Sequence, residues 1–432
     1  MADYFKRFVH SEVSGSIVLL ACTIIALVWA NSPWAESYQH MLHIKAGISV
    51  GGHVFTLSLH HWVNDGLMVV FFFVVGLEIK RELVVGRLSS LDRAILPVTA
   101  AVGGMVVPAL LYYALNHGGP AAAGWGVPMA TDIAFALGLL AVFGKRVPIG
   151  LKVFLMALAI ADDLGAVAVI AIYYTEKINV TALIVAAVLL VVLAGFIKAR
   201  INRVGLLAML IVAFWAAVLV SGIHATIAGI LVALLVPVKS SIEPDEFMGA
   251  LRTSLDELET GTDLTRDSMI EESAQLAAID RVWTAGERMY PSGLALEHYL
   301  HPAQAFFVLP LFALFNAGVT LTGDVGAVLA TREALGVIVG LFLGKQLGVF
   351  GFTWLAVKSG RAHLPEGVTF GHVWGVSALA GIGFTMSLFV SDLAFKAPEL
   401  LAGAKLGILV ASLLSGTWGA ILLWRLLPRK AA

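Results

Sequence analysis

Long apolar runs separated by short polar connections dominate the hydrophobic pattern of this 432-residue chain. A helix of about 20 apolar residues crosses a bilayer core of about 30 Å, and windows of that length predict twelve spans. The shortest, 223–237, is nearly continuous with the span before it. The predicted spans cover residues 14–31, 61–79, 95–116, 121–143, 151–175, 181–199, 204–221, 223–237, 303–322, 334–357, 368–391 and 404–427.

Composition agrees with a chain that lies in a membrane. Hydrophobic residues make up 59% of it and charged residues only 13%, with a mean hydropathy of +0.90, whereas soluble domains carry about 25% charged residues. The net charge of -1 and the lack of basic tracts give no indication of nucleic-acid binding, so the lipid bilayer is the expected partner. A single cysteine, Cys22, excludes a disulfide within the chain and a thiolate metal cluster.

The distribution of Lys and Arg predicts the orientation. We expect one transmembrane domain over 1–432 with an uncleaved first span, and twelve spans place both termini on one side. The connections on that side carry 22 Lys and Arg against 5 on the other, with Lys345 inside a span. Leaving out the long loop after the eighth span still gives 17 against 5. Because basic residues mark cytoplasmic loops, both termini are predicted to be cytoplasmic.

Two connections differ from the rest. Residues 43–60 carry β-branched residues on both sides of Gly51 and Gly52, which predicts a β-hairpin outside the cytoplasm. An isolated hairpin is marginal in water, so it either pairs with a second copy in a homodimer or lies on the membrane.

Residues 239–290 form an acidic cytoplasmic loop with twelve acids and five bases. We expect amphipathic helices or partial disorder there. The loop would act as a spacer or bind a partner.

Four ionisable residues lie near the middle of predicted spans, where they are costly and by default mark an ion or proton path. Two adjacent carboxylates repel each other by about 3 kcal/mol at roughly 5 Å and an effective dielectric near 20, which favours a proton on one of them. Such a carboxyl can trade its proton for a small hard cation. A purely structural ion pair is the alternative. The four residues are Asp132, Asp162, Asp163 and Lys345.

Two spans carry candidate breaks. Pro128 and Thr131 precede Asp132, and Gly381-Ile-Gly-Phe-Thr385 interrupts another apolar run. GVPMATDIAF from Gly126 and GVSALAGIGF from Gly375 agree at four of ten positions, and corresponding interruptions in two halves point to a transporter site. Opposed half-helix dipoles would then need compensating charges, which Asp132 and Lys345 can supply.

Seven motifs together resemble the NhaA family of sodium/proton antiporters over nearly the whole chain. The resemblance implies an all-α polytopic membrane protein with about 12 transmembrane helices, inverted repeats and two crossed discontinuous helices, together with a small extracytoplasmic β-hairpin. The motifs are VFFFVVGLEIKRELVVG from Val70, PMATDIAFALG from Pro128, FLMALAIADDLGAVAVIAI from Phe154, SGIHATIAG from Ser221, LEHYLHP from Leu296, LPLFALFNAGV from Leu309 and SALAGIGFTMSLF from Ser377.

The resemblance also implies roles for individual residues. Asp163 matches the main carboxylate that exchanges Na⁺ or Li⁺ for protons, and Asp162 matches its neighbour, which pairs with the buried Lys345. Asp132 and Thr131 match the broken-helix pair that borders the cation site. A further set matches residues associated with pH regulation, although each histidine could equally make an ordinary hydrogen bond. These are Glu78, Arg81, Glu82, His224, Glu297, His298 and His301.

The resulting expectation is a secondary antiporter in the bacterial inner membrane that exports Na⁺ or Li⁺ in exchange for protons, without a cofactor. It would be pH-regulated and work by alternating access at the midplane aspartates. Three alternatives stay open from the sequence: a gated cation channel, a sodium-coupled organic-anion symporter, and an intramembrane enzyme with paired aspartates. The enzyme lacks a recognisable substrate motif in either aspartate-bearing span.

Overall fold

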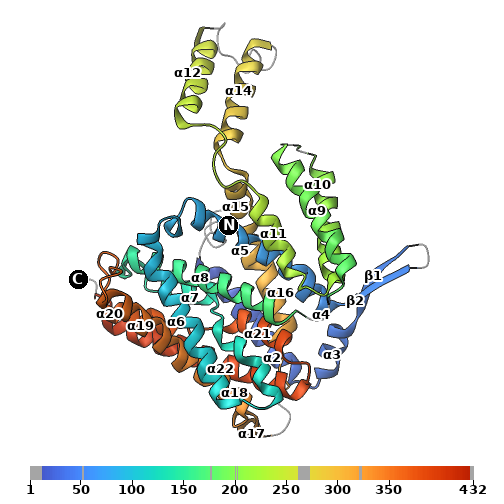
Figure 1. Ribbon diagram of the computed structural model, residues 1–432, viewed down its shortest axis with the longest axis vertical. Helices are drawn as coiled ribbons and strands as arrows, with labels where there is room; N and C mark the ends of the chain where they lie inside the picture. Colours follow the sequence, from blue (N-terminus) through green and yellow to red (C-terminus); the bar gives the residue numbers. More distant parts are fainter. Residues whose placement is uncertain are drawn as a thin grey trace.

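The computed structural model describes residues 12–50, 53–175, 178–199, 201, 203–260, 273–320 and 324–428. These residues form a helical bundle with one two-stranded sheet (Figure 1). The elements are α2 (Glu12–Ala30), α3 (Ala35–His43), β1 (Lys45–Val50), β2 (His53–Ser58), α4 (Leu59–His61), η1 (Trp62–Leu67), α5 (Met68–Val84), η2 (Arg87–Ser89), α6 (Leu91–Asn116), η3 (Pro120–Met129), α7 (Ile133–Ala141), η4 (Gly144–Arg146), α8 (Ile149–Tyr173), α9 (Val180–Lys198), α10 (Val204–Ser221), α11 (Thr226–Leu235), α12 (Pro244–Thr260), α14 (Ser273–Met289), α15 (Ser292–Ala303), η5 (Gln304–Val308), α16 (Leu309–Asn316), α17 (Val325–Leu329), α18 (Arg332–Ile338), η6 (Val339–Gly344), α19 (Lys345–Lys358), α20 (Phe370–Leu379), α21 (Phe384–Ala394) and α22 (Pro398–Leu426).

All twelve predicted ranges fall on helices. In the described part of the chain, nine helices are long and apolar enough to cross a membrane, and the bent pair α20 and α21 makes a tenth. The remaining two ranges fall on α5, which continues α4 and η1 without a gap, and on the ten-residue α11. The fold is therefore the expected all-helical membrane protein with a small hairpin.

The largest difference between predicted and observed boundaries is at the ninth span. The span expected at 303–322 belongs to a continuous helix that begins at Ser292 and ends at Asn316. The sequence LEHYLHP interrupts the apolar window with Glu297, His298 and His301. These side chains line an internal cavity, and polar groups are tolerated in a span when they face a water-filled cavity.

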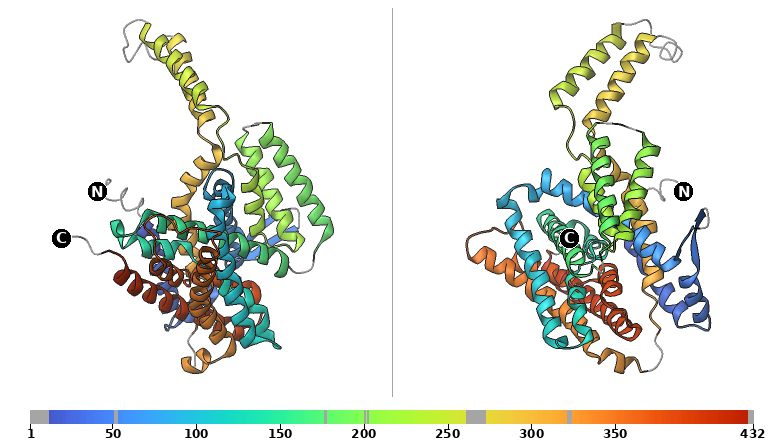
Figure 2. Two further views of the ribbon diagram at one scale, coloured as in Figure 1. Left: turned by 60° about the vertical axis from the view of Figure 1, so that its left-hand side comes forward. Right: turned by 45° about the vertical axis from the view of Figure 1, so that its right-hand side comes forward.

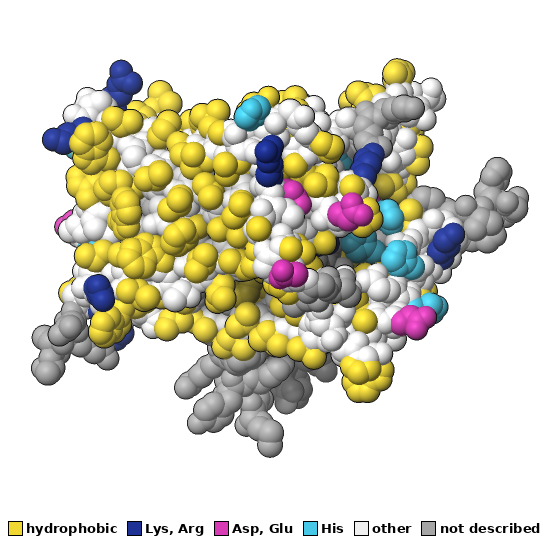
Figure 3. Space-filling model, turned by 90° about the horizontal axis from the view of Figure 1, so that it is seen from below, with side chains coloured by type: hydrophobic (Ala, Val, Ile, Leu, Met, Phe, Trp, Pro, Cys, Tyr) yellow, Lys and Arg dark blue, Asp and Glu magenta, His cyan; other side chains and the backbone are white. Residues whose placement is uncertain are grey.

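Exposed apolar side chains cover much of the surface. On the face seen in Figure 3 they form a broad area, with the charged and histidine side chains gathered mainly toward its edges. In α9 and α10 only 11% and 17% of the most apolar window is buried inside the protein. Apolar surface of this extent is rare on soluble monomers, and it is the surface that lipid tails would cover.

Helices α6 and α19 approach each other closely because glycines face one another. A Cβ added at Gly348 would meet the backbone carbonyl of Gly103, and one added at Gly103 would meet that of Gly348. Small residues at such positions let two backbones touch. The contact sets the position of α19, which begins at Lys345.

Two segments extend from the bundle. Strands β1 and β2 pair antiparallel, from Lys45 opposite Ser58 to Val50 opposite His53; the turn expected at Gly51 and Gly52 lies outside the described residues. Helices α12 and α14 lie side by side and project away from the other helices (Figure 2). The acidic loop is thus helical at 244–260 and 273–289, and the part between these helices is not described.

Candidate functional site

Helix α8 places Asp162 and Asp163 in different surroundings because neighbouring residues on a helix point about 100° apart. Lys345 Nζ forms an ion pair with Asp162 Oδ2, and Thr131 Oγ1 lies 2.6 Å from the same oxygen. Lys345 and Asp162 are 0% and 2% exposed. The two opposite charges therefore have each other as partners in a site without access to bulk water.

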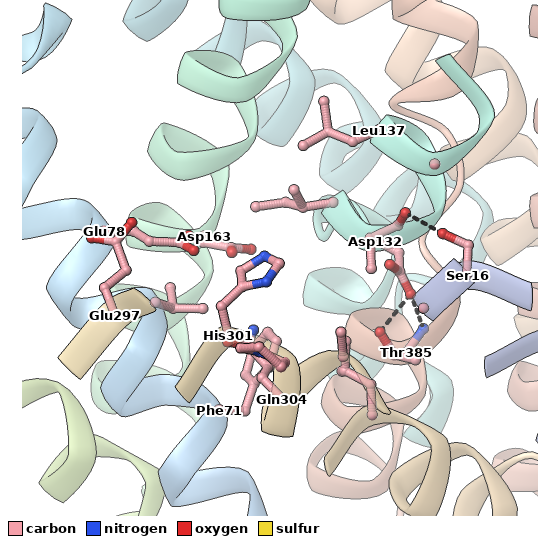
Figure 4. A pocket seen from close by; sticks show the side chains of 18 of the residues that line it. Ser16, Phe71, Glu78, Asp132, Leu137, Asp163, Glu297, His301, Gln304 and Thr385 are labelled. Atoms are coloured by element: carbon pink, nitrogen blue, oxygen red, sulfur yellow. Dashed lines mark hydrogen bonds between the residues drawn. The ribbon is translucent and has the colours of Figure 1, made fainter. Parts of the chain in front are cut away.

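Asp163 lines a cavity of about 620 Å³. Its two carboxylate oxygens are buried and have no hydrogen-bond partner among the described residues. Figure 4 shows Glu78 beside Asp163 on one side of this cavity, with Asp132 and Thr385 on the other. A buried carboxylate without a donor is expected either to carry a proton or to bind a cation.

The two interrupted spans meet at their breaks. In the first, the short turns of η3 end at Met129 and α7 begins at Ile133; in the second, α20 and α21 are bent by 48°. The Asp132 backbone N–H donates to the Ile382 carbonyl over 2.6 Å, and the Ser387 hydroxyl donates to the Val127 carbonyl over 2.8 Å. Backbone N–H and C=O groups at each break are thus hydrogen-bonded by the other broken span. In a membrane interior such groups must find a partner within the protein.

Asp132 accepts hydrogen bonds from the first turns of both α7 and α21. Its Oδ1 accepts the Phe135 N–H over 3.1 Å, and its Oδ2 accepts the Thr385 N–H over 3.0 Å and the Thr385 hydroxyl over 2.5 Å. Both helix N-termini carry partial positive charge, which one carboxylate here compensates. The Ser16 hydroxyl from α2 donates to the nearby Ala134 carbonyl over 2.8 Å.

A charged cluster lies at the Glu297 end of the cavity. Arg81 Nε is 3.2 Å from Glu297 Oε2, and Arg81 Nη2 is 3.6 Å from Glu82 Oε1. Glu78, Arg81, Glu297, His298 and His301 all line the cavity. The structure therefore brings together all but one of the residues for which the family resemblance implies a role in pH regulation.

His224 lies apart from this cluster. Its Nε2 is 2.8 Å from the Tyr174 carbonyl oxygen at the end of α8, so it connects α8 to the segment between α10 and α11. This contact is of the ordinary hydrogen-bonding kind that the sequence left open.

The sequence assigned no role to Thr385, Gln304 or Ser16, which are polar residues of the cavity lining. Thr385 makes two of the hydrogen bonds to Asp132, and the side-chain oxygen of Gln304 is buried in the cavity without a hydrogen-bond partner among the described residues. Thr385 is the last residue of the predicted interruption Gly381-Ile-Gly-Phe-Thr385, which was an available signal. Gln304 begins the π-helical turn η5, and no periodicity in the sequence marks that turn.

Comparisons with known proteins agree with this arrangement. The sequence model of a family described as Na+/H+ antiporter 1 matches residues 6–423. A Na(+)/H(+) antiporter NhaA from Sulfurimonas denitrificans is 44% identical over 98% of this chain and 95% of its own. Those from Koribacter versatilis and Oleidesulfovibrio alaskensis are 45% and 46% identical, again over 98% of this chain and over 91% and 94% of their own. The chain is therefore a multi-pass membrane protein and belongs to the NhaA family of Na⁺/H⁺ antiporters, which are transporters and not enzymes.

Proposed function

We propose that this protein exports Na⁺ or Li⁺ in exchange for protons and that Asp163 is the group that carries both. The observation that supports this most strongly is the Asp163 carboxylate, which is buried at the cavity wall with both oxygens lacking a donor. A bound proton or a bound cation satisfies the carboxylate equally, but the two exclude each other. That exclusion is the minimum requirement for coupled exchange.

We propose separate roles for the neighbouring Asp162, Asp132 and Thr131. Asp162 is occupied by Lys345 and Thr131, so we infer that it holds the lysine and approaches the cation only when that ion pair loosens. Asp132 lines the cavity at the break of the first interrupted span, and Thr131 of the same break lies behind it against Asp162. Carboxylate and hydroxyl oxygens of this kind suit Na⁺ and Li⁺, which are small hard cations.

Proton flux in vesicles tests the assignment. In vesicles with a preformed ΔpH, added Na⁺ or Li⁺ should collapse the gradient in the parental protein, whereas Asp163→Asn should abolish the response. Asp92→Asn, at an exposed carboxylate in the first turn of α6, is the matched control and should behave as the parent. Full exchange by Asp163→Asn would show that the site is elsewhere, and conduction without competition between cation and proton would show a channel.

We further propose alternating access in the bacterial inner membrane, with both termini in the cytoplasm. The excess of Lys and Arg in the connections on the side of the termini supports this orientation, and it makes the Glu297 end of the cavity cytoplasmic. In a Cys22→Ser background, Glu246→Cys in α12 should then react with an impermeant thiol reagent only in inverted vesicles. Reaction in intact cells would contradict the orientation.

The charged cluster at the Glu297 end is proposed to regulate exchange by pH. Arg81 lies between Glu82 and Glu297, and His298 and His301 belong to the residue type that titrates nearest to physiological pH. Protonation there would change the charge at the Glu297 end of the cavity, from which we propose that cations reach Asp163. An exchange rate that stays constant from about pH 6 to 9 would contradict this role.

Residues 43–60 are proposed to join two copies in a homodimer. The sheet has only two strands, and such a hairpin gains stability when its edge pairs with another strand. Deleting the hairpin should convert the dimer to a monomer in detergent. A dimer that persists after the deletion would place the interface elsewhere.

A further inference from the structure

Five polar residues lie together at the end of the bundle that adjoins the β-hairpin. We call them the hairpin-end cluster: His60 of α4, Asn64 of η1, Asn316 of α16, Asp392 of α21 and Lys405 of α22. They come from five elements, and they lie outside the lining of the cavity as the described residues form it.

An amide pair forms the centre of the cluster. The Asn316 Nδ2 group donates to Asn64 Oδ1 over 2.8 Å, and the Asn64 Nδ2 group donates back to Asn316 Oδ1 over 3.2 Å. His60 Nε2 lies 3.0 Å from the same Asn316 oxygen. Asn64 and Asn316 are buried, so these hydrogen bonds hold η1 against the end of α16 without competition from water.

An ion pair extends the cluster to the broken helix. Lys405 Nζ lies 2.8 Å from Asp392 Oδ1, and the Asn64 Nδ2 group lies 3.4 Å from Asp392 Oδ2. The Lys405 and Asp392 side chains are only 11% and 8% exposed. Separating two buried opposite charges is unfavourable unless water replaces the lost partner, so this contact favours one arrangement of α21.

A layer of three phenylalanines lies next to the cluster. The Phe389 ring centroid is 5.4 Å from that of Phe72 and 6.2 Å from that of Phe312. These rings are at most 1% exposed. A packed aromatic layer excludes hydrated ions, because a cation would lose its water without gaining oxygen ligands.

Along both α16 and α21, a residue that lines the cavity is followed by a residue of the aromatic layer and then by a residue of the cluster. Along α16, Leu309 lines the cavity, Phe312 belongs to the aromatic layer and Asn316 to the cluster. Thr385, Phe389 and Asp392 repeat this order along α21. Positions separated by three, four and seven residues share one helix face, so each helix connects the cation site directly to the cluster.

The segment formed by η1 and α5 also passes from the cavity to the aromatic layer and then to the cluster, but against the chain direction. From the cavity, Val75 is followed by Phe72 in the aromatic layer and then by Asn64 in the cluster. Arg81 and Glu297 line the cavity at its other end, remote from the cluster. A path from Asp163 toward the hairpin end is thus closed first by the phenylalanines and then by the polar contacts.

We propose that the hairpin-end cluster is the latch of a gate and that it must open for the cation site to reach the hairpin side. This inference rests on the alternating access proposed above. Because α21 carries Thr385, which binds Asp132, and also carries Asp392, a shift of this helix at the cation site acts directly on the latch. The Asp392 to Lys405 pair and the Asn64 to Asn316 pair therefore act as positioning residues that favour closure on the hairpin side.

Thiol accessibility tests the latch without relying on transport. Cys22 is the single cysteine in the sequence, so Cys22→Ser provides a background for two probes, Ala313→Cys in α16 and Ser391→Cys in α21, at fully buried positions. An impermeant thiol reagent added from each side in turn should react slowly from the hairpin side. With Asp392→Asn or Lys405→Met added, that reaction should accelerate by roughly tenfold or more, the size typical of coupled conformational equilibria.

The surface ion pair between Arg281 and Glu257 supplies a matched control. Glu257→Gln with Arg281→Met removes a pair of the same type from α12 and α14 and should leave the reaction rate unchanged. Exchange by the parent is measured in parallel, so that a failure of the proposed transport is seen separately. Folded Asp392→Asn and Lys405→Met variants that react as slowly as the parent would overturn the proposal.

Closing the latch permanently gives a second, independent readout. In the Cys22→Ser background, Asn64→Cys with Asn316→Cys can be bridged by a short bifunctional methanethiosulfonate. The bridged protein should lose Na⁺-driven proton flux and regain it after reduction. Undiminished exchange by fully bridged protein would overturn the proposal, even if the neutral variants did not fold.

Discussion

The buried Lys345 depends on a partner of opposite charge. It is fully buried in the described structure, and its ammonium group is paired with Asp162. Removing one partner from a buried pair leaves a charge without compensation and typically destabilises a protein by about 3 to 5 kcal/mol. The neighbouring Asp163 then experiences an uncompensated Asp162, so stability and cation binding should change together.

We predict that Lys345→Ala lowers the free energy of unfolding by about 3 kcal/mol, because Asp162 loses its ionic partner. Thermal unfolding in detergent measures the effect. Lys358→Ala supplies the control, since Lys358 ends the same helix but is exposed near the Trp354 ring, and it should change stability by less than about 0.5 kcal/mol. Equal melting of the parent and Lys345→Ala would show that the ion pair contributes nothing to stability.

The helix that carries Lys345 is positioned by its contact with α6. Gly348 lies one turn after the lysine, and its backbone meets that of Gly103. A side chain at Gly348 would push the two helices apart and move Lys345 relative to Asp162. The ion pair therefore depends on a glycine contact that involves no charge at all.

We predict that Gly348→Ala lowers exchange by roughly tenfold and stability by about 1 to 3 kcal/mol, the usual range for overpacking. Vesicle assays and detergent melting measure the two effects. Gly351→Ala is the same change three residues further along α19, where an added Cβ would meet nothing within 4 Å. It should leave exchange unchanged, and the interpretation fails if both variants lose the same activity.

The elements themselves were largely predictable, because apolar runs of bilayer length are a strong signal. Acids and a lysine at midspan were equally evident, since few other positions give a charge so large a penalty. The hairpin-end cluster was not predictable. Asn64, Asn316, Asp392 and Lys405 lie toward span ends, where a polar side chain can reach water and nothing in one sequence shows that they meet.

At the scale of the whole molecule, α12 and α14 form an extension with its own internal contacts. The two helices pack on each other, and Arg288 Nη2 lies 3.5 Å from Glu246 Oε1. At the base, the Ser241 N–H donates to the Arg288 carbonyl over 2.9 Å, and the Gly293 N–H donates to the Pro237 carbonyl over 2.8 Å. The chain thus leaves the bundle and returns to it at nearly the same place.

We predict that replacing residues 243–287 with a short Gly-Ser linker preserves Na⁺/H⁺ exchange, because Ser241 and Arg288 are already adjacent and α15 enters the bundle after them. Joining ends that lie this close should perturb the bundle little, since closure entropy rises only slowly with loop length. KM for Na⁺ and the pH profile, measured in vesicles, should match those of the parent. A shifted pH profile with unchanged KM would instead assign the extension to regulation, since it precedes the helix that carries Glu297, His298 and His301.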